Sequence, residues 1–194
     1  EDAVLAALEK ARPSAPDASF VKGVRGEYPA KTIPRRSGLP PDEAALQESI
    51  SAHTEANLDD LAREYLARSP KNLDLDVARE VVHPEYATSP DVRTRDTHAI
   101  QSSAGAVIDK AFEMKLAEFA NKPARERRGV VFVAGLPGIE KTTALAKPGL
   151  SALVDGADLT VQGTGRSASD VLARITAARA AGEPVTYVHL AHSD

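Results

Sequence analysis

The fold is decided by residues 130–143, which read VVFVAGLPGIEKTT. The first half is apolar without polar alternation, as is typical of a strand covered on both faces. The second half follows the formula G-x-x-x-x-G-K-[ST] at every position but one. Glycines let such a loop turn sharply with its N–H groups aimed inward, and the helix that follows adds a partial positive charge. The stretch therefore predicts a phosphate-binding loop (P-loop) between a strand and a helix.

Each part of this loop has a predicted role. The backbone from Gly135 to Gly138 would cradle the phosphates of ATP or GTP, and Lys141 would reach the β- and γ-phosphates. The Thr142 hydroxyl would coordinate Mg²⁺, the one cofactor that we expect. The predicted nucleotide-binding residues are Gly135, Leu136, Pro137, Gly138, Ile139, Glu140, Lys141, Thr142 and Thr143.

Glu140 is the position that breaks the formula, because it stands where the motif has glycine before the lysine. A carboxylate about 4 Å from a phosphate charge, at an effective dielectric constant near 20, is repelled by about 4 kcal/mol. Two harmless arrangements are open: Glu140 points to solvent, or it pairs with Lys141. The sequence is thus compatible with a competent loop and with a disabled one.

The residues after the loop alternate between helix and strand patterns. Strands are predicted at 130–134, 152–156 and 184–190, with helices from about 141 and over 169–181. This alternation predicts an α/β fold with a parallel sheet, of which three strands are the N-terminal half of a P-loop domain. Asp155 would end the second strand, where open α/β sheets place ligand residues, and is one candidate catalytic base.

Three regions are expected along the chain. Residues 1–41 combine a helix over 2–12 with an arm rich in proline and glycine. Residues 42–128 form a helical region, with apolar periodicity that predicts helices over 41–68 and 91–121. Residues 129–194 form the P-loop domain, which we expect to be cut short at its C-terminus.

Composition excludes several classes of protein. The 194 residues carry 24 basic and 28 acidic side chains, a net charge of −4, so no global basic field favours nucleic acid as a partner. The absence of cysteine excludes disulfides and thiolate metal sites. No apolar run reaches the roughly 20 residues that span a bilayer, so we expect no membrane partner and a cytoplasmic location.

Two segments together resemble the zeta-toxin group of P-loop kinases. The first is VVFVAGLPGIEKTTAL, which is similar to the strand, loop and helix that open the nucleotide-binding core of that family. The second is DLDVAR at 74–79 followed by HPEY at 83–86, which is similar to the family's D-x-D-x-x-R…H-P-x-Y signature at the substrate site. In the best-known members the signature follows the loop, whereas here it precedes the loop.

The resemblance implies a kinase that transfers the γ-phosphate of ATP or GTP to a hydroxyl of a small molecule, such as a nucleotide sugar. It assigns the role of catalytic base to Asp76, and Arg79, one helical turn on, would orient that carboxylate. The other interpretation of this segment is that Asp74 or Asp76 caps a helix starting near Val77. The alternative function is a catalytically impaired P-loop scaffold that acts through a protein partner such as an antitoxin.

Overall fold

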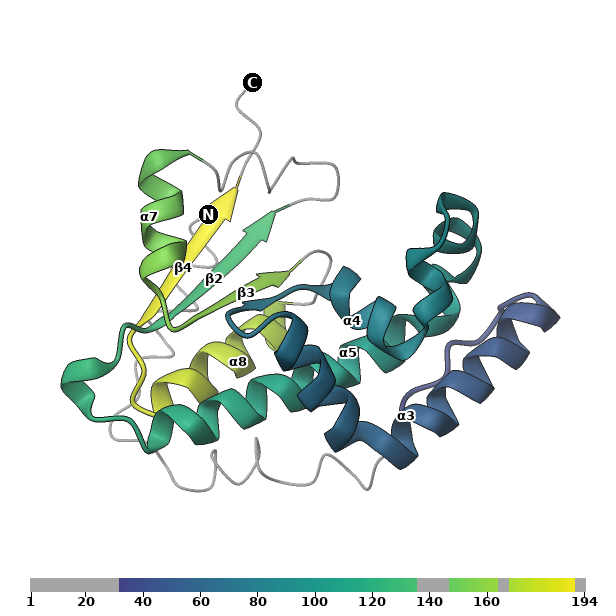
Figure 1. Ribbon diagram of the computed structural model, residues 1–194, viewed down its shortest axis with the longest axis horizontal. Coiled ribbons are helices and arrows are strands. Elements are labelled where there is room, and N and C mark those ends of the chain that lie inside the picture. Colours follow the sequence, from purple (N-terminus) through teal and green to yellow (C-terminus); the bar gives the residue numbers. More distant parts are fainter. Residues whose placement is uncertain (1–31, 136–146, 164–167, 191–194) are drawn as a thin grey trace. The chain divides into compact units, whose positions relative to one another are not determined.

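A four-stranded parallel sheet organises the described part of the chain (Figure 1). The computed structural model describes residues 32–135, 147–163 and 168–190. Its strands are β1 (Asn72–Leu73), β2 (Val130–Gly135), β3 (Leu159–Gly163) and β4 (Val185–Leu190), in the spatial order β1-β3-β2-β4. Because every pairing is parallel, the four strands end at one edge, the carboxyl edge, and begin at the opposite one, the amino edge.

Five α-helices accompany the sheet within the described ranges, together with the short 3₁₀ helices η1 (Pro84–Ala87) and η2 (Ala124–Glu126). The predicted helices over 91–121 and 169–181 are confirmed as α5 and α8, and the strands at 130–134 and 184–190 as β2 and β4. The helix predicted over 41–68 is present as α3, but it is kinked at Asn57, whose φ and ψ are not helical. The bounds of the α-helices are α3 Pro41–Arg68, α4 Leu75–Val82, α5 Pro90–Ala120, α7 Pro148–Gly156 and α8 Ala168–Ala180.

The prediction of a strand over 152–156 is wrong, because these residues form the second half of α7. Pro148 occupies the start of that helix, where its fixed φ and missing N–H do no harm. The strand lies three residues further on, at β3, whose Thr160 and Val161 are β-branched and buried. An apolar run of four or five residues fits either structure, and the proline was the signal that should have decided it.

The sheet also has a strand more than the three predicted. β1 is only two residues long and pairs with β3 through Asn72 opposite Thr160 and Leu73 opposite Val161. A strand this short has no periodicity to detect. It attaches the segment after α3 to the sheet that contains β2.

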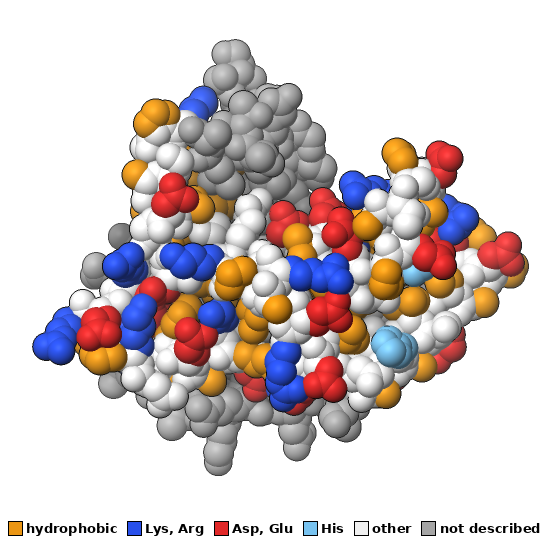
Figure 2. Space-filling model, viewed as in Figure 1, with side chains coloured by type: hydrophobic (Ala, Val, Ile, Leu, Met, Phe, Trp, Pro, Cys, Tyr) orange, Lys and Arg blue, Asp and Glu red, His pale blue; other side chains and the backbone are white. Residues whose placement is uncertain are grey.

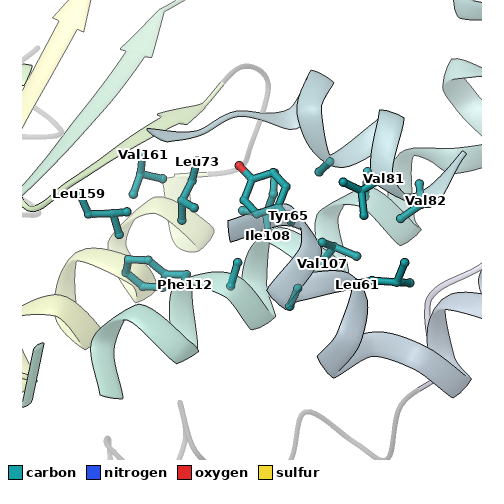
Figure 3. Packing of buried hydrophobic residues seen from close by; sticks show 14 of the residues in the cluster. Leu61, Tyr65, Leu73, Val81, Val82, Val107, Ile108, Phe112, Leu159 and Val161 are labelled. Carbon is teal, nitrogen blue, oxygen red and sulfur yellow. The ribbon is translucent and has the colours of Figure 1, made fainter. Parts of the chain in front are cut away.

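One core joins the helical region to the sheet. Helices α5 and α8 lie along one face of the sheet and α7 lies on the other (Figure 1). On the first face Phe112 of α5 meets Phe132 of β2 edge to face, with ring centroids 6.3 Å apart. Figure 3 shows the buried cluster continuing without a break from Leu159 and Val161 in β3 to Leu61 in α3. The chain from Lys31 onward accordingly forms one compact unit.

Three further predictions lie partly or wholly outside the described residues. These are the helix over 2–12, the proline- and glycine-rich arm, of which only residues 32–41 are described, and the helix from about 141, whose residues up to 146 are not described. No helix in the described ranges has the length and apolar character required to cross a membrane.

Candidate functional site

Strand β2, which precedes the predicted loop, ends at the carboxyl edge of the sheet. Strand β2 is buried from Val130 to Val133 and ends at Gly135, opposite Leu190 of β4. Gly135 is therefore the last described residue before the loop. The remaining predicted nucleotide-binding residues lie outside the described residues; they are Leu136, Pro137, Gly138, Ile139, Glu140, Lys141, Thr142 and Thr143.

Parallel pairing brings the acidic segment to the same edge. Leu73 of β1 and Phe132 of β2 are both level with Val161 of the intervening β3. Neighbouring strands lie about 4.8 Å apart, so β1 and β2 are about 10 Å apart across the sheet. Asp76 follows Leu73 by three residues, as Gly135 follows Phe132. The strands that precede these two segments, about 60 residues apart in the sequence, thus end at one edge of the sheet, with β3 between them.

The turn between β1 and α4 is fixed from two directions. The Asp74 side chain caps α4, accepting a hydrogen bond from the Asp76 N–H at 2.8 Å. The Tyr65 hydroxyl of α3 points toward β1 (Figure 3), where it accepts from the Asp74 N–H at 2.7 Å and faces the Asn72 and Asp74 carbonyls. Burial raises the pKa of Tyr65 far above its usual range, so this hydroxyl keeps its proton. Asp74 is therefore the capping residue, and Asp76 keeps its carboxylate for other contacts.

The Asp76 carboxylate is exposed and held by a less exposed arginine. Arg79, one turn along α4, contacts it at 2.7 Å; the Asp76 side chain is 66% exposed and that of Arg79 15%. The guanidinium of Arg79 also donates to Gln101 of α5 and to the Tyr86 hydroxyl. Because Gln101 and Tyr86 hold the guanidinium of Arg79, its positive charge stays beside the Asp76 carboxylate. A carboxylate oriented in this way can act as a proton acceptor.

The Tyr86 ring contacts the guanidinium groups of two arginines and helps to hold Arg79 in place. Its buried ring lies under the guanidinium groups of Arg79 and Arg93, at 5.7 and 5.5 Å from the ring centroid. Arg93 also donates to the Tyr86 carbonyl, and its guanidinium lies 3.5 Å from Glu80. Both guanidinium groups are within the range of cation–π attraction, so η1 and the first turns of α5 hold Arg79 in place.

A buried histidine and aspartate close the end of α4. His83 Nε2 lies 3.0 Å from a carboxylate oxygen of Asp96, which is 1% exposed. Arg95 donates two hydrogen bonds to the same carboxylate. The hydrogen bonds from Arg95, with a smaller contribution from His83, hold the pKa of Asp96 below its usual range. His83 thus acts as a structural partner that ties α4 to α5.

Asp155 lies far from this site. It is an exposed residue in the last turn of α7, and four residues later β3 begins. That position is at the amino edge, opposite the end of β2, so the prediction that Asp155 lies at the carboxyl end of a strand is wrong. Asp158, next to the start of β3, accepts from Lys122 and from the Arg128 N–H and serves as a structural anchor.

Tyr65 and Gln101 were missed by sequence reasoning. Tyr65 is the one aromatic residue in α3, and its position opposite the D-L-D turn is the signal that could have been used. Nothing in the sequence singles out Gln101. Among the residues that the structure describes, no cluster of three or more His, Asp or Glu side chains could hold a metal ion.

The described residues form an α/β fold with an all-parallel sheet. At the carboxyl edge of this sheet, β1 leads into α4, whose first turn carries Asp74 and Asp76. No protein-family model matches the chain, and no curated protein matches it either.

Proposed function

We propose that this chain is a zeta-toxin-like P-loop kinase that transfers the γ-phosphate of ATP or GTP to a hydroxyl of a small molecule. The observation that supports the proposal is that the strand before the predicted loop and the strand before Asp76 end at the same edge of the sheet. The strand that leads into the G-x-x-x-x-x-K-T sequence and the strand that leads into Asp76 are two positions apart in one parallel sheet. Open α/β sheets bind their ligands at this edge.

In the proposed reaction the loop binds the nucleotide and α4 binds the acceptor. The acceptor oxygen attacks the γ-phosphorus, its proton passes to the Asp76 carboxylate, and the bond from the γ-phosphorus to the bridging oxygen breaks to release the nucleoside diphosphate. Lys141 stabilises charge on the transferring phosphoryl group, and Arg79 holds Asp76 in position. Bound at the Thr142 hydroxyl and the phosphates, Mg²⁺ would supply charge neutralisation, in keeping with its preference for oxygen ligands.

A second candidate function is a P-loop scaffold without catalysis that acts through a protein partner such as an antitoxin. Glu140 favours this alternative, because its carboxylate repels phosphate in the tightest part of the loop. The anchored Asp76–Arg79 pair favours the enzyme, because a scaffold has no need for an exposed carboxylate on a rigid arginine.

Nucleotide binding tests the loop directly. Mg-ATP and Mg-GTP are titrated calorimetrically into the chain and into its Glu140→Gly and Lys141→Ala variants, with circular dichroism as the check on folding. We expect micromolar binding that Glu140→Gly tightens and that Lys141→Ala weakens at least tenfold. Binding by the Glu140→Gly variant alone favours the scaffold, and no binding by any variant contradicts the P-loop proposal.

Turnover tests the acidic segment, with a matched control in the same chain. Asp76→Asn and Asp155→Asn each remove one exposed carboxylate from an α-helix, at opposite edges of the sheet. Loss of a general base lowers kcat by about 10²–10⁴-fold, so we expect that loss for Asp76→Asn, with nucleotide affinity unchanged, and none for Asp155→Asn. Equal activity of the two variants would remove Asp76 from the mechanism. The readout is phosphate transfer from labelled ATP to a panel of hydroxylated acceptors, nucleotide sugars included.

The proposal extends to the sheet and the compartment. We propose that the four strands belong to the N-terminal half of a larger P-loop sheet, since Tyr187 on β4 is 36% exposed while the residues of β2 beside it are buried. We place the activity in the cytoplasm, where nucleoside triphosphates are available and a chain without cysteine needs no oxidising environment.

A further inference from the structure

The amino edge of the sheet carries a cavity of about 680 Å³ that the proposed function does not use. The cavity is partly open to solvent. Five basic side chains and three carboxylates line it, together with the exposed Pro70 and the buried Phe119. The charged lining residues are Lys71, Lys115, Lys122, Arg125, Arg128, Glu118, Glu126 and Asp158.

The strands fix the backbone of this cavity. Lys71 directly precedes β1, and its carbonyl accepts from the Thr160 N–H of β3 at 2.7 Å. Arg128 lies just before β2, and its N–H donates to the Asp158 carboxylate at 2.6 Å. Lys71 and Arg128 thus flank the start of β3 from either side, on strands about 10 Å apart. Figure 2 shows basic and acidic side chains interleaved on this part of the surface, around η2.

The carboxylates of the cavity are already partnered, and two of its cations are not. Asp158 is satisfied by Lys122 at 2.6 Å as well as by the Arg128 N–H, and Glu118 by Lys115 at 2.7 Å. Within the described ranges, neither the Lys71 ammonium nor the Arg128 guanidinium has a carboxylate partner. The net positive charge of the cavity is therefore concentrated on two side chains at fixed strand starts.

We propose that this cavity binds a small anion with two phosphate groups, each neutralised by Lys71 or Arg128. Guanidinium and ammonium groups are the usual protein partners of phosphate. The three interleaved carboxylates disfavour a long polyanion, since a nucleic acid backbone or an anionic membrane would have to pass over them. The site lies about 20 Å from the carboxyl edge along the six residues of β2, so it is separate from the proposed nucleotide site.

Pyrophosphate is the probe, and the experiment uses the Lys141→Ala chain so that the loop contributes little to binding. Calorimetry compares this protein with two derivatives of equal net charge. One adds Lys71→Gln and Arg128→Gln in the cavity, and the other adds Arg63→Gln and Arg68→Gln, which remove two exposed basic residues of α3. We expect the cavity derivative to lose at least tenfold in affinity and the α3 derivative to stay within twofold.

Three results would overturn the proposal. The first is no measurable binding by the Lys141→Ala chain at millimolar pyrophosphate, and the second is an equal change in both derivatives, which would reflect net charge alone. The third is displacement of pyrophosphate by a short DNA duplex that binds more tightly at the same salt concentration, which would make nucleic acid the ligand. Because Lys141 is absent throughout, none of these results depends on whether the loop binds nucleotides.

Discussion

Replacing Tyr65 with phenylalanine tests whether α3 holds the turn that presents Asp76. The ring is fully buried, so phenylalanine preserves the packing and removes only the hydroxyl. That hydroxyl accepts from the Asp74 N–H at 2.7 Å and shares its single proton between the carbonyls of Asn72 and Asp74, at 3.2 and 3.1 Å. A polar group left without its partner in the interior costs about 1–3 kcal/mol. We therefore expect the free energy of unfolding to fall by about 2 kcal/mol, which lowers Tm by about 4–8 °C in a domain of this size.

The assay is urea unfolding followed by circular dichroism, with Tyr187→Phe as the matched control. Tyr187 is 36% exposed on β4, so the loss of its hydroxyl should change stability by no more than about 0.5 kcal/mol. The slope of free energy against urea should be the same in both variants, because neither alters the surface exposed on unfolding. If Tyr65→Phe loses no more stability than Tyr187→Phe, the hydroxyl does not hold the turn and the reasoning is refuted.

Two further predictions concern the amino edge. Gly129 has a φ of +90°, and a Cβ there would lie 2.5 Å from the Pro184 carbonyl oxygen, so Gly129→Ala should cost more than about 2 kcal/mol in urea unfolding. Gly156→Ala at the end of α7, where a Cβ meets open space, should stay within about 0.5 kcal/mol; equal losses would contradict the argument. Burial, and next the charge of Asp158, raises the pKa of Glu183, so the stability that its neutral form contributes is present at acid pH and is lost as the pH rises through that pKa. Glutamine cannot ionise, so the free energy of unfolding of Glu183→Gln should rise relative to that of the parent chain as the pH increases from 5 to 8. A difference in unfolding free energy that does not change with pH would show that Glu183 does not ionise in this range.

The long helices were predictable because each has apolar residues at helical spacing over many turns. Pro41–Arg68 and Pro90–Ala120 follow that pattern between clear breakers, and their bounds could be read to within a residue. The second strand was misplaced because ALVDG is too short for its period to decide between helix and strand. Pro148 at the start of α7 was the local signal for a helix, and LTVQG provides the strand between β1 and β2.

The acidic segment was found from its residue types, but its support was not predictable. Asp76 and Arg79 are three residues apart on a helix, so their contact follows from sequence spacing. Gln101 of α5 contacts Arg79 from 22 residues further along the chain. Tyr65 of α3 contacts Asp74 from 9 residues before it. Contacts of this kind depend on how α3, α4 and α5 pack against one another, and no local pattern encodes them.

The order of the two motifs along the chain does not decide whether they lie at the same edge of the sheet. A parallel sheet gathers the ends of its strands at one edge whatever their order in sequence, so a motif after β1 and a motif after β2 meet there even though β1 comes first. Strand β3 follows β1 and β2 in the sequence but lies between them in the sheet, and its pairing with both fixes their separation. For the proposed kinase, a D-x-D segment before the loop would therefore serve an acceptor as well as one after it. The constraint on that acceptor would be the spacing between β1 and β2, and not the order of the two segments.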